Sequence, residues 1–139
     1  MKGFKVLNNS VVERALEDET RQYLVGNLKR PQKLTHIHDE KLEVGITNYE
    51  QSTNELPHYH TQATEYQYVL SGNTTYYNLD TNEEITFNAG DFYVIYPQTT
   101  YAQKSAENTR ILFIKNPSIN DKVNVKNTEL SKTWYDKII

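Results

Sequence analysis

The sequence predicts an all-β fold, an antiparallel β-sandwich or jelly-roll barrel with short helical segments near the N- and C-termini. Two observations support this prediction. Runs of aromatic and β-branched residues follow one another at short intervals and are separated by turn residues, a pattern typical of sandwiches and barrels. No strand–helix–strand unit fits the chain. With 139 residues, the chain is expected to form a single domain, residues 1–139.

The first expected element is a helix that begins at Ser10. It is indicated by apolar residues at helical spacing, namely Val11, Val12, Ala15 and Leu16. Ser10 as the N-cap and Glu13 three residues later would form a capping box. After Asp18 the composition changes, and residues 22–28 suit a strand better than a helix.

The remaining strands are expected between this segment and the C-terminal tail. They are residues 41–50, 66–70, 74–79, 85–87, 92–96 and 110–115. Several of the intervening turns contain Gly or Asn, which favours hairpins and antiparallel pairing over crossovers. Asn116-Pro117-Ser118 is expected to close the β region. Residues 127–139 are expected to form a final helix around Leu130 and Trp134, with a strand as the alternative.

Composition excludes several classes of protein. The chain has no cysteine, which excludes disulfides, thiolate metal sites and cysteine nucleophiles. The net charge of -3 and the scattered basic residues argue against nucleic-acid binding. No run is long enough for a transmembrane helix, and the N-terminus lacks the apolar stretch of a secretory signal. A cytoplasmic protein without a membrane partner is therefore expected.

The most informative stretch contains a pair of histidines followed by a carboxylate. His58 and His60 are two residues apart, so on an extended chain both side chains lie on the same face. If residues 61–64 form a turn between adjacent strands, Glu65 returns beside the histidines. Two imidazoles and a carboxylate suit a divalent transition metal: Fe, Mn, Ni, Co or Zn. Histidine pairs also occur by chance, and single histidines are commonly held by hydrogen bonds alone.

The wider spacing resembles the two motifs of the cupin superfamily. His58-x-His60, Glu65 and Gly72 follow the spacing of the first motif. The segment from Gly90-Asp91 to Pro97 is similar to the second. The resemblance implies a single-domain cupin in which His58, His60 and Glu65 hold the metal inside a β-barrel.

The sequence departs from the cupin pattern at the place of a ligand. Metal-binding cupins usually supply a third histidine four residues after the proline of the second motif, and here that residue is Tyr101. Ser52 and Ser105 stand where a glycine and an asparagine are common. Three interpretations of Tyr101 remain open: a fourth metal ligand, a phenol that contacts substrate or transfers a proton beside an open coordination position, or a packing residue in a protein without metal.

Three further features have a functional and a structural interpretation. His36 and His38 form a second pair without a matching carboxylate, which favours an exposed turn or rim over a role at the mouth of the pocket. Arg110 either meets an anionic group or lies on the surface. Most tyrosines are expected in the core or at a dimer interface, with a few lining the cavity.

The cupin resemblance implies several activities. The first hypothesis is a metal-dependent enzyme of isomerase, epimerase or lyase type that acts on a small polar metabolite such as a sugar derivative, with Tyr101 and Glu65 handling protons. The alternatives are a non-catalytic cupin that binds a carbohydrate or other polar ligand, and a metal-dependent dioxygenase. A homodimer that uses part of the tyrosine-rich outer face is also expected.

Overall fold

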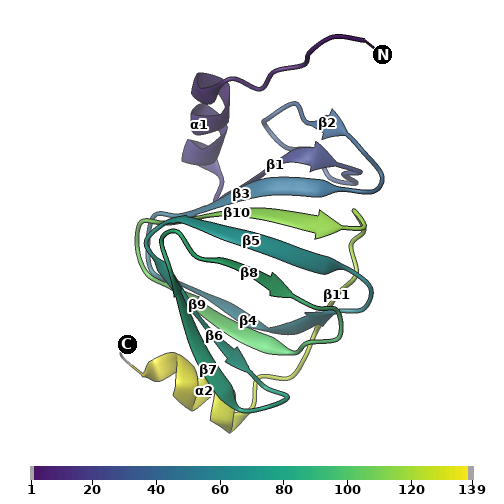
Figure 1. The fold of residues 1–139 in the computed structure, drawn as a ribbon. Helices are drawn as coiled ribbons and strands as arrows, with labels where there is room; N and C mark the ends of the chain where they lie inside the picture. The colour runs from purple at the N-terminus through teal and green to yellow at the C-terminus, as the bar shows by residue number, and fades with distance from the viewer. Residues whose placement is uncertain (1, 138–139) are drawn as a thin grey trace.

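The computed structural model describes residues 2–137 and has two β-sheets and two short helices (Figure 1). The helices are α1 (Asn9–Asp18) and α2 (Glu129–Asp136). The strands are β1 (Arg21–Gly26), β2 (Ile37–His38), β3 (Glu43–Tyr49), β4 (Thr53–His60), β5 (Thr64–Ser71), β6 (Asn73–Asn78), β7 (Glu83–Asn88), β8 (Phe92–Ile95), β9 (Tyr101–Ser105), β10 (Thr109–Asn116) and β11 (Lys122–Asn124). The predicted all-β jelly roll with terminal helices is confirmed.

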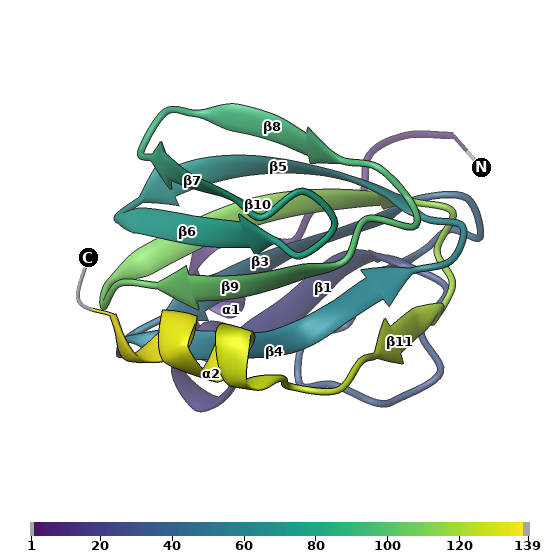
Figure 2. The ribbon, with the colours of Figure 1, turned by 90° about the horizontal axis from the view of Figure 1, so that it is seen from below.

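The two sheets face each other as a sandwich (Figures 1 and 2). One sheet has six strands in the order β2-β1-β3-β10-β5-β8, and the other has five in the order β11-β4-β9-β6-β7. Neighbouring strands are antiparallel apart from β1 and β2, which are parallel.

Most turns carry the chain from one sheet to the other, which corrects the expectation of hairpins. Among the expected turns with Gly or Asn, the one at Asn82 joins paired neighbours, β6 and β7, and its φ is 62°. Gly72 instead ends β5 in one sheet and leads into β6 in the other. Its φ is 76°, and a Cβ there would lie 2.6 Å from the Thr109 Cα. Glycine is therefore required by both backbone conformation and space.

Helix α1 covers one half of the outer face of the six-stranded sheet. Its apolar side packs a buried cluster of Val12, Ala15, Leu16 and Leu34, with Leu24 and Ile46 against it. The N-cap is Asn8, whose side chain accepts a hydrogen bond from the backbone N–H of Val11 at 3.1 Å. The predicted Ser10 capping box is wrong, because Glu13 pairs with Arg110 on the sheet instead.

Helix α2 covers part of the five-stranded sheet, on its outer side (Figure 2). The helical interpretation of the tail is thus confirmed. Trp134 is buried and stacks obliquely on Tyr77 of β6, with ring centres 5.6 Å apart. The expectation that Asn116-Pro117-Ser118 closes the β region is wrong, because β11 follows it and pairs with the end of β4.

The interior of the sandwich has an aromatic part and a polar part. Val69, Tyr76, Tyr93 and Tyr101 form a buried cluster between the sheets. Beside this cluster lies a cavity lined by charged side chains. In residues 2–137, no helix has the length and apolar character needed to cross a membrane.

Candidate functional site

The cavity between the two sheets gathers the residues that the motif predicts. Its volume is about 140 Å³. The six-stranded sheet contributes Glu65 from β5 and Arg21 from β1, and the five-stranded sheet contributes His58, His60 and Tyr101. Strands β4 and β5 lie in opposite sheets, so Glu65 meets the histidines across the interior. The prediction that residues 61–64 join adjacent strands of one sheet is therefore wrong. The prediction that this turn brings Glu65 beside the two histidines is confirmed.

His58 is held in one tautomer by the backbone. Its Nδ1 lies 2.7 Å from the carbonyl oxygen of Leu56, which can only accept, so Nδ1 carries the hydrogen. Its Nε2 lies 3.0 Å from the Tyr101 hydroxyl. Burial lowers the pKa of His58, which favours the neutral ring. The Nε2 lone pair is therefore available on the cavity side.

His60 lies between two carboxylates. Its Nε2 is 2.9 Å from Glu65 Oε1, and its Nδ1 is 2.8 Å from Asp121 Oδ1. Burial alone would lower the pKa of His60, but the hydrogen bond and charge of Glu65 and the hydrogen bond of Asp121 outweigh it and raise the pKa. For Glu65, burial alone would raise the pKa, but the hydrogen bond and charge of His60 lower it. Both shifts favour an imidazolium paired with a carboxylate.

Asp121 also fixes the turn that joins the two motif strands. Its second oxygen, Oδ2, accepts the backbone N–H groups of Gln62 and Ala63, each at 2.8 Å. Burial opposes ionisation of Asp121, but these two donors and His60 hold its pKa at about 2. One carboxylate therefore orients His60 and the turn before Glu65 at the same time.

Tyr101 is buried and points at His58 from the neighbouring strand β9. The two residues are partners in the β4–β9 register, and their ring centres are 4.6 Å apart. Burial raises the pKa of Tyr101 well above its usual value of 10, and the negative charge of Glu65 raises it further. The side chain is accordingly a neutral phenol that donates its hydrogen bond to His58 Nε2.

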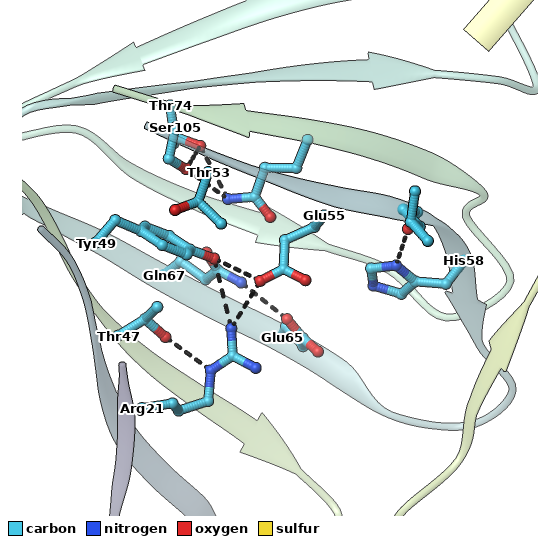
Figure 3. A network of polar contacts seen from close by, with 12 residues as sticks. Arg21, Thr47, Tyr49, Thr53, Glu55, His58, Glu65, Gln67, Thr74 and Ser105 are labelled. Atoms are coloured by element: carbon cyan, nitrogen blue, oxygen red, sulfur yellow. Dashed lines mark hydrogen bonds and ion pairs between the residues drawn. The ribbon is translucent and has the colours of Figure 1, made fainter. Parts of the chain in front are cut away.

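The Glu65 carboxylate is oriented by a hydrogen bond from the Gln67 amide, which two phenols contact in turn. The Gln67 Nε2 donates to Glu65 Oε2 at 2.8 Å (Figure 3). The hydroxyls of Tyr76 and Tyr93 lie 3.0 and 2.7 Å from Gln67 Oε1 and 2.6 Å from each other. Each phenol has one hydrogen, so at least one of them donates to the amide oxygen, and the amide nitrogen then faces Glu65. The orientation of the carboxylate is thus set by buried groups.

The donor set of His58, His60 and Glu65 fits a divalent transition metal in type and orientation. Each ring is anchored through Nδ1, by a carbonyl for His58 and a carboxylate for His60, which leaves Nε2 on the cavity side. As the side chains stand in residues 2–137, no group of three or more His, Asp or Glu is arranged so that it could hold a metal ion. Metal binding would replace the His58–Tyr101 and His60–Glu65 hydrogen bonds.

The other features interpreted from the sequence lie away from the cavity. Arg110 meets an anionic group of this chain, the Glu13 carboxylate of α1, in a two-point ion pair at 2.6 and 2.9 Å, and it is not part of the described cavity lining. His36 and His38 lie at and beside the short strand β2, and the described cavity lining does not include them.

Several residues that line the cavity or contact its side chains carry no sequence signal. Asp121 and Arg21 come from segments far from the motifs and meet the site only through the fold. Glu55 and His58 are three residues apart, so simple alternation would place them on opposite faces. A register shift between them, a β-bulge or similar irregularity in the pairing with β9, lets both line the cavity.

The family comparison matches the region that contains both motifs. Residues 45–115, just over half of the chain, match a family model described as Cupin domain. A search of curated proteins finds no significant match to the chain.

Solved structures with the same fold come from several bacteria. KdgF from Halomonas sp. is 17% identical, with a TM-score of 0.56 over 73% of this chain and 80% of that chain. The nucleoside dehydratase Pac13 from Streptomyces is 19% identical, with a TM-score of 0.54 over 63% and 71%. Oxalate decarboxylase from Bacillus subtilis, which has Mn(II) centres, is 12% identical, with a TM-score of 0.53 over 62% and 24%.

Proposed function

The chain belongs to the Cupin domain family, and from that premise we propose that it is a metal-dependent enzyme that acts on a small polar metabolite such as a sugar derivative. The reaction class is lyase, isomerase or epimerase. One observation carries the proposal: a single cavity places two anchored imidazoles and a buried phenol on one wall and a buried carboxylate on the other. Such convergence of polar groups in a cavity is typical of catalytic sites.

The metal would be held by His58 Nε2, His60 Nε2 and Glu65. Fe, Mn, Ni, Co and Zn all accept ligands of these types. When bound, such an ion supplies a Lewis acid that polarises a carbonyl or hydroxyl oxygen of the substrate. Asp121 would keep the His60 ring oriented through Nδ1, where it already lies at 2.8 Å.

Tyr101 supplies the proton at the phenolic oxygen. It remains protonated because burial and the charge of Glu65 raise the pKa of Tyr101. Once His58 Nε2 serves as a ligand, the Tyr101 hydroxyl loses its present acceptor and is free to donate to a substrate oxygen. A general acid of this kind assists departure of a hydroxyl as water or protonation of an enolate oxygen.

Glu65 supplies the acceptor on the opposite wall. The pKa of Glu65 is lowered overall because His60 outweighs the effect of burial, so the carboxylate is ionised. Its Oε2 is fixed by Gln67 and its Oε1 faces His60. Elimination and isomerisation require that a proton is removed on one side of a bound molecule and delivered on the other. Glu65 would remove the proton and Tyr101 would deliver it.

The relatives support this class without defining the reaction. Pac13 is a nucleoside dehydratase, and dehydration is lyase chemistry. The decarboxylase of the same fold has Mn(II) centres. Both are less than 20% identical to this chain, so they contribute to the proposal only through the shared fold.

The test is a turnover screen of the metal-loaded protein against a panel of neutral and acidic sugar derivatives, read by NMR. We expect loss of water, isomerisation or epimerisation of at least one compound, and loss of that activity in Glu65→Gln. Tight binding without turnover would instead support a non-catalytic cupin. Oxygen consumption with oxidised products would support a dioxygenase.

A further inference from the structure

Three cationic side chains line the cavity in addition to the histidines, and they differ in their surroundings. They are Arg21, Lys115 and Lys122. Lys115 lies between two carboxylates, 3.6 Å from Glu43 and 3.8 Å from Asp121, so its charge is balanced locally. Lys122 is exposed on the edge strand β11. Arg21 is the one of the three held in place by hydrogen bonds on the inner face of β1.

The guanidinium of Arg21 is fixed by three neighbours (Figure 3). Its Nε donates to the Thr47 hydroxyl at 2.9 Å, and its Nη2 contacts Glu55 Oε1 at 3.3 Å and the Tyr49 hydroxyl at 3.5 Å. Phe113 lies beneath it, with the ring centre 5.9 Å from the guanidinium carbon. These contacts hold the group in one orientation inside the cavity.

One edge of this guanidinium has no protein acceptor. Arginine carries five N–H donors, and the bonds above engage those of Nε and Nη2. Among the described residues, Nη1 has no hydrogen-bond partner, and Figure 3 shows it directed away from Tyr49 and Thr47. The Arg21 side chain keeps 39% of its surface exposed although it lines the cavity. Its free donors are therefore accessible to a molecule that enters the cavity.

Glu55 does not neutralise this edge fully. The distance from Glu55 Oε1 to Arg21 Nη2 is 3.3 Å, and Nη2 is the guanidinium nitrogen that it contacts. The same oxygen accepts a shorter hydrogen bond from the Tyr49 hydroxyl, at 2.8 Å. A two-point ion pair, such as that of Arg110 with Glu13 at 2.6 and 2.9 Å, occupies both terminal nitrogens of the guanidinium. At Arg21 the carboxylate contacts only one of them, so the donors of the other stay available.

We propose that Arg21 binds an anionic group of the substrate, a carboxylate or a phosphate, and so restricts the enzyme to acidic derivatives of small polar metabolites. The inference rests on the proposed function, because it concerns the same cavity. Arg21 lies on β1, outside the matched residues 45–115, so it is a feature of this chain beyond its family motifs. Guanidinium groups bind carboxylates and phosphates through charge-assisted hydrogen bonds.

The experiment measures binding of three probes by calorimetry: D-glucose, D-glucuronate and D-glucose 6-phosphate. We expect one of the two acidic probes to bind at least about 10-fold more tightly than glucose, and Arg21→Met to remove that preference, because a charge-assisted hydrogen bond contributes about 10- to 100-fold. The acidic probe that is preferred identifies carboxylate or phosphate as the group. Arg110→Met is the matched control, since this arginine pairs with Glu13 on the outer face, and it should keep the preference.

A second variant tests the inference if Arg21→Met does not fold. Glu55→Gln removes the competing carboxylate and should strengthen binding of the acidic probe several-fold, which a purely structural ion pair would not do. Equal binding of all three probes, binding of none, or an unchanged affinity in Glu55→Gln overturns the inference. Turnover of neutral compounds alone would overturn it while the proposed function stands, whereas Arg21-dependent binding without turnover of any compound would overturn the proposed function and leave the anion site.

Discussion

At the scale of single residues, Tyr101 is the departure from the family pattern that affects the chemistry most. It lies where a third histidine is common, and its hydroxyl is 3.0 Å from His58 Nε2. Formation of a phenolate there is disfavoured, because burial raises the pKa of Tyr101 well above 10. Tyr101 is therefore a neutral donor in the site as it stands, and we predict that it remains a donor and does not become a ligand when a metal binds.

Tyr101→Phe should retain metal and lose turnover by about 10²- to 10⁴-fold, the range for removal of a general acid. Metal content and kcat are measured side by side on the same preparation. Tyr77→Phe, whose hydroxyl bonds to Asn82 outside the cavity, is the matched control and should behave as wild type. Loss of metal would show that Tyr101 is a ligand, and wild-type values for both quantities would show that it only packs.

Asp121 should make the metal-free protein sensitive to acid. Its pKa is held at about 2, below the ordinary 3.8, so its contribution to stability is present above pH 3.8 and is lost as the pH falls towards 2. The shift corresponds to about 2 kcal/mol of unfolding free energy. Urea unfolding of metal-free protein between pH 2 and 5 should show a shallower acid dependence in Asp121→Asn than in wild type.

The control for this prediction is Asp18→Asn, which removes one carboxylate at an exposed position, 60% accessible, at the end of α1. Parallel pH profiles for wild type and Asp121→Asn would mean that the contacts of Asp121 to His60 and to the turn contribute nothing to stability.

At the scale of elements, the sequence predicted most of the long strands, but the expected set lacked β4 and β9, and the connectivity was predicted poorly. Alternation along an extended chain places Glu65, Gln67 and Val69 on one face of β5, and all three are buried. Turns do occur where Gly and Asn indicated them, as at Gly72 and Asn82. These residues could not show whether the next strand pairs with its predecessor or crosses to the facing sheet, because both need the same backbone conformations. The short strands β2 and β11 carry too few residues for a periodic pattern.

The outer face of β5 and its neighbour β8 should form a dimer interface. Tyr66, Tyr68, Leu70 and Phe92 are 38–62% exposed there, and α1 covers only the other half of this sheet. We expect wild type to be a dimer and Tyr68→Glu to be a monomer, because a buried unpaired charge is costly. Light scattering on the eluting protein measures this.

Ile85→Glu is the matched control, since Ile85 is 51% exposed on β7 of the other sheet, and it should remain a dimer. A monomeric wild type at high concentration would contradict the prediction of a homodimer.

At the scale of the whole molecule, the site depends on contacts that no local pattern encodes. The motif spacing identified His58, His60 and Glu65 in advance, because those residues lie close together in the sequence and alternate predictably. The residues that orient or charge the site, Arg21 and Asp121, come from β1 and from the loop before β11, which lie far apart in the sequence. Long-range ion pairs of this kind follow from the jelly-roll topology and become visible only once the sheets are assembled.

The central claim is that the cavity is a metal site built on His58, His60 and Glu65. The most direct measurement is the metal content of protein purified without a polyhistidine tag, for wild type, the His58→Ala/His60→Ala double variant and the His36→Ala/His38→Ala double variant. The second pair has the same spacing but lies outside the described cavity lining. We predict about one divalent transition metal per chain in wild type and in the His36/His38 variant, and none in the His58/His60 variant. Metal retained after loss of His58 and His60, or a metal-free wild type that cannot be loaded, would contradict the account.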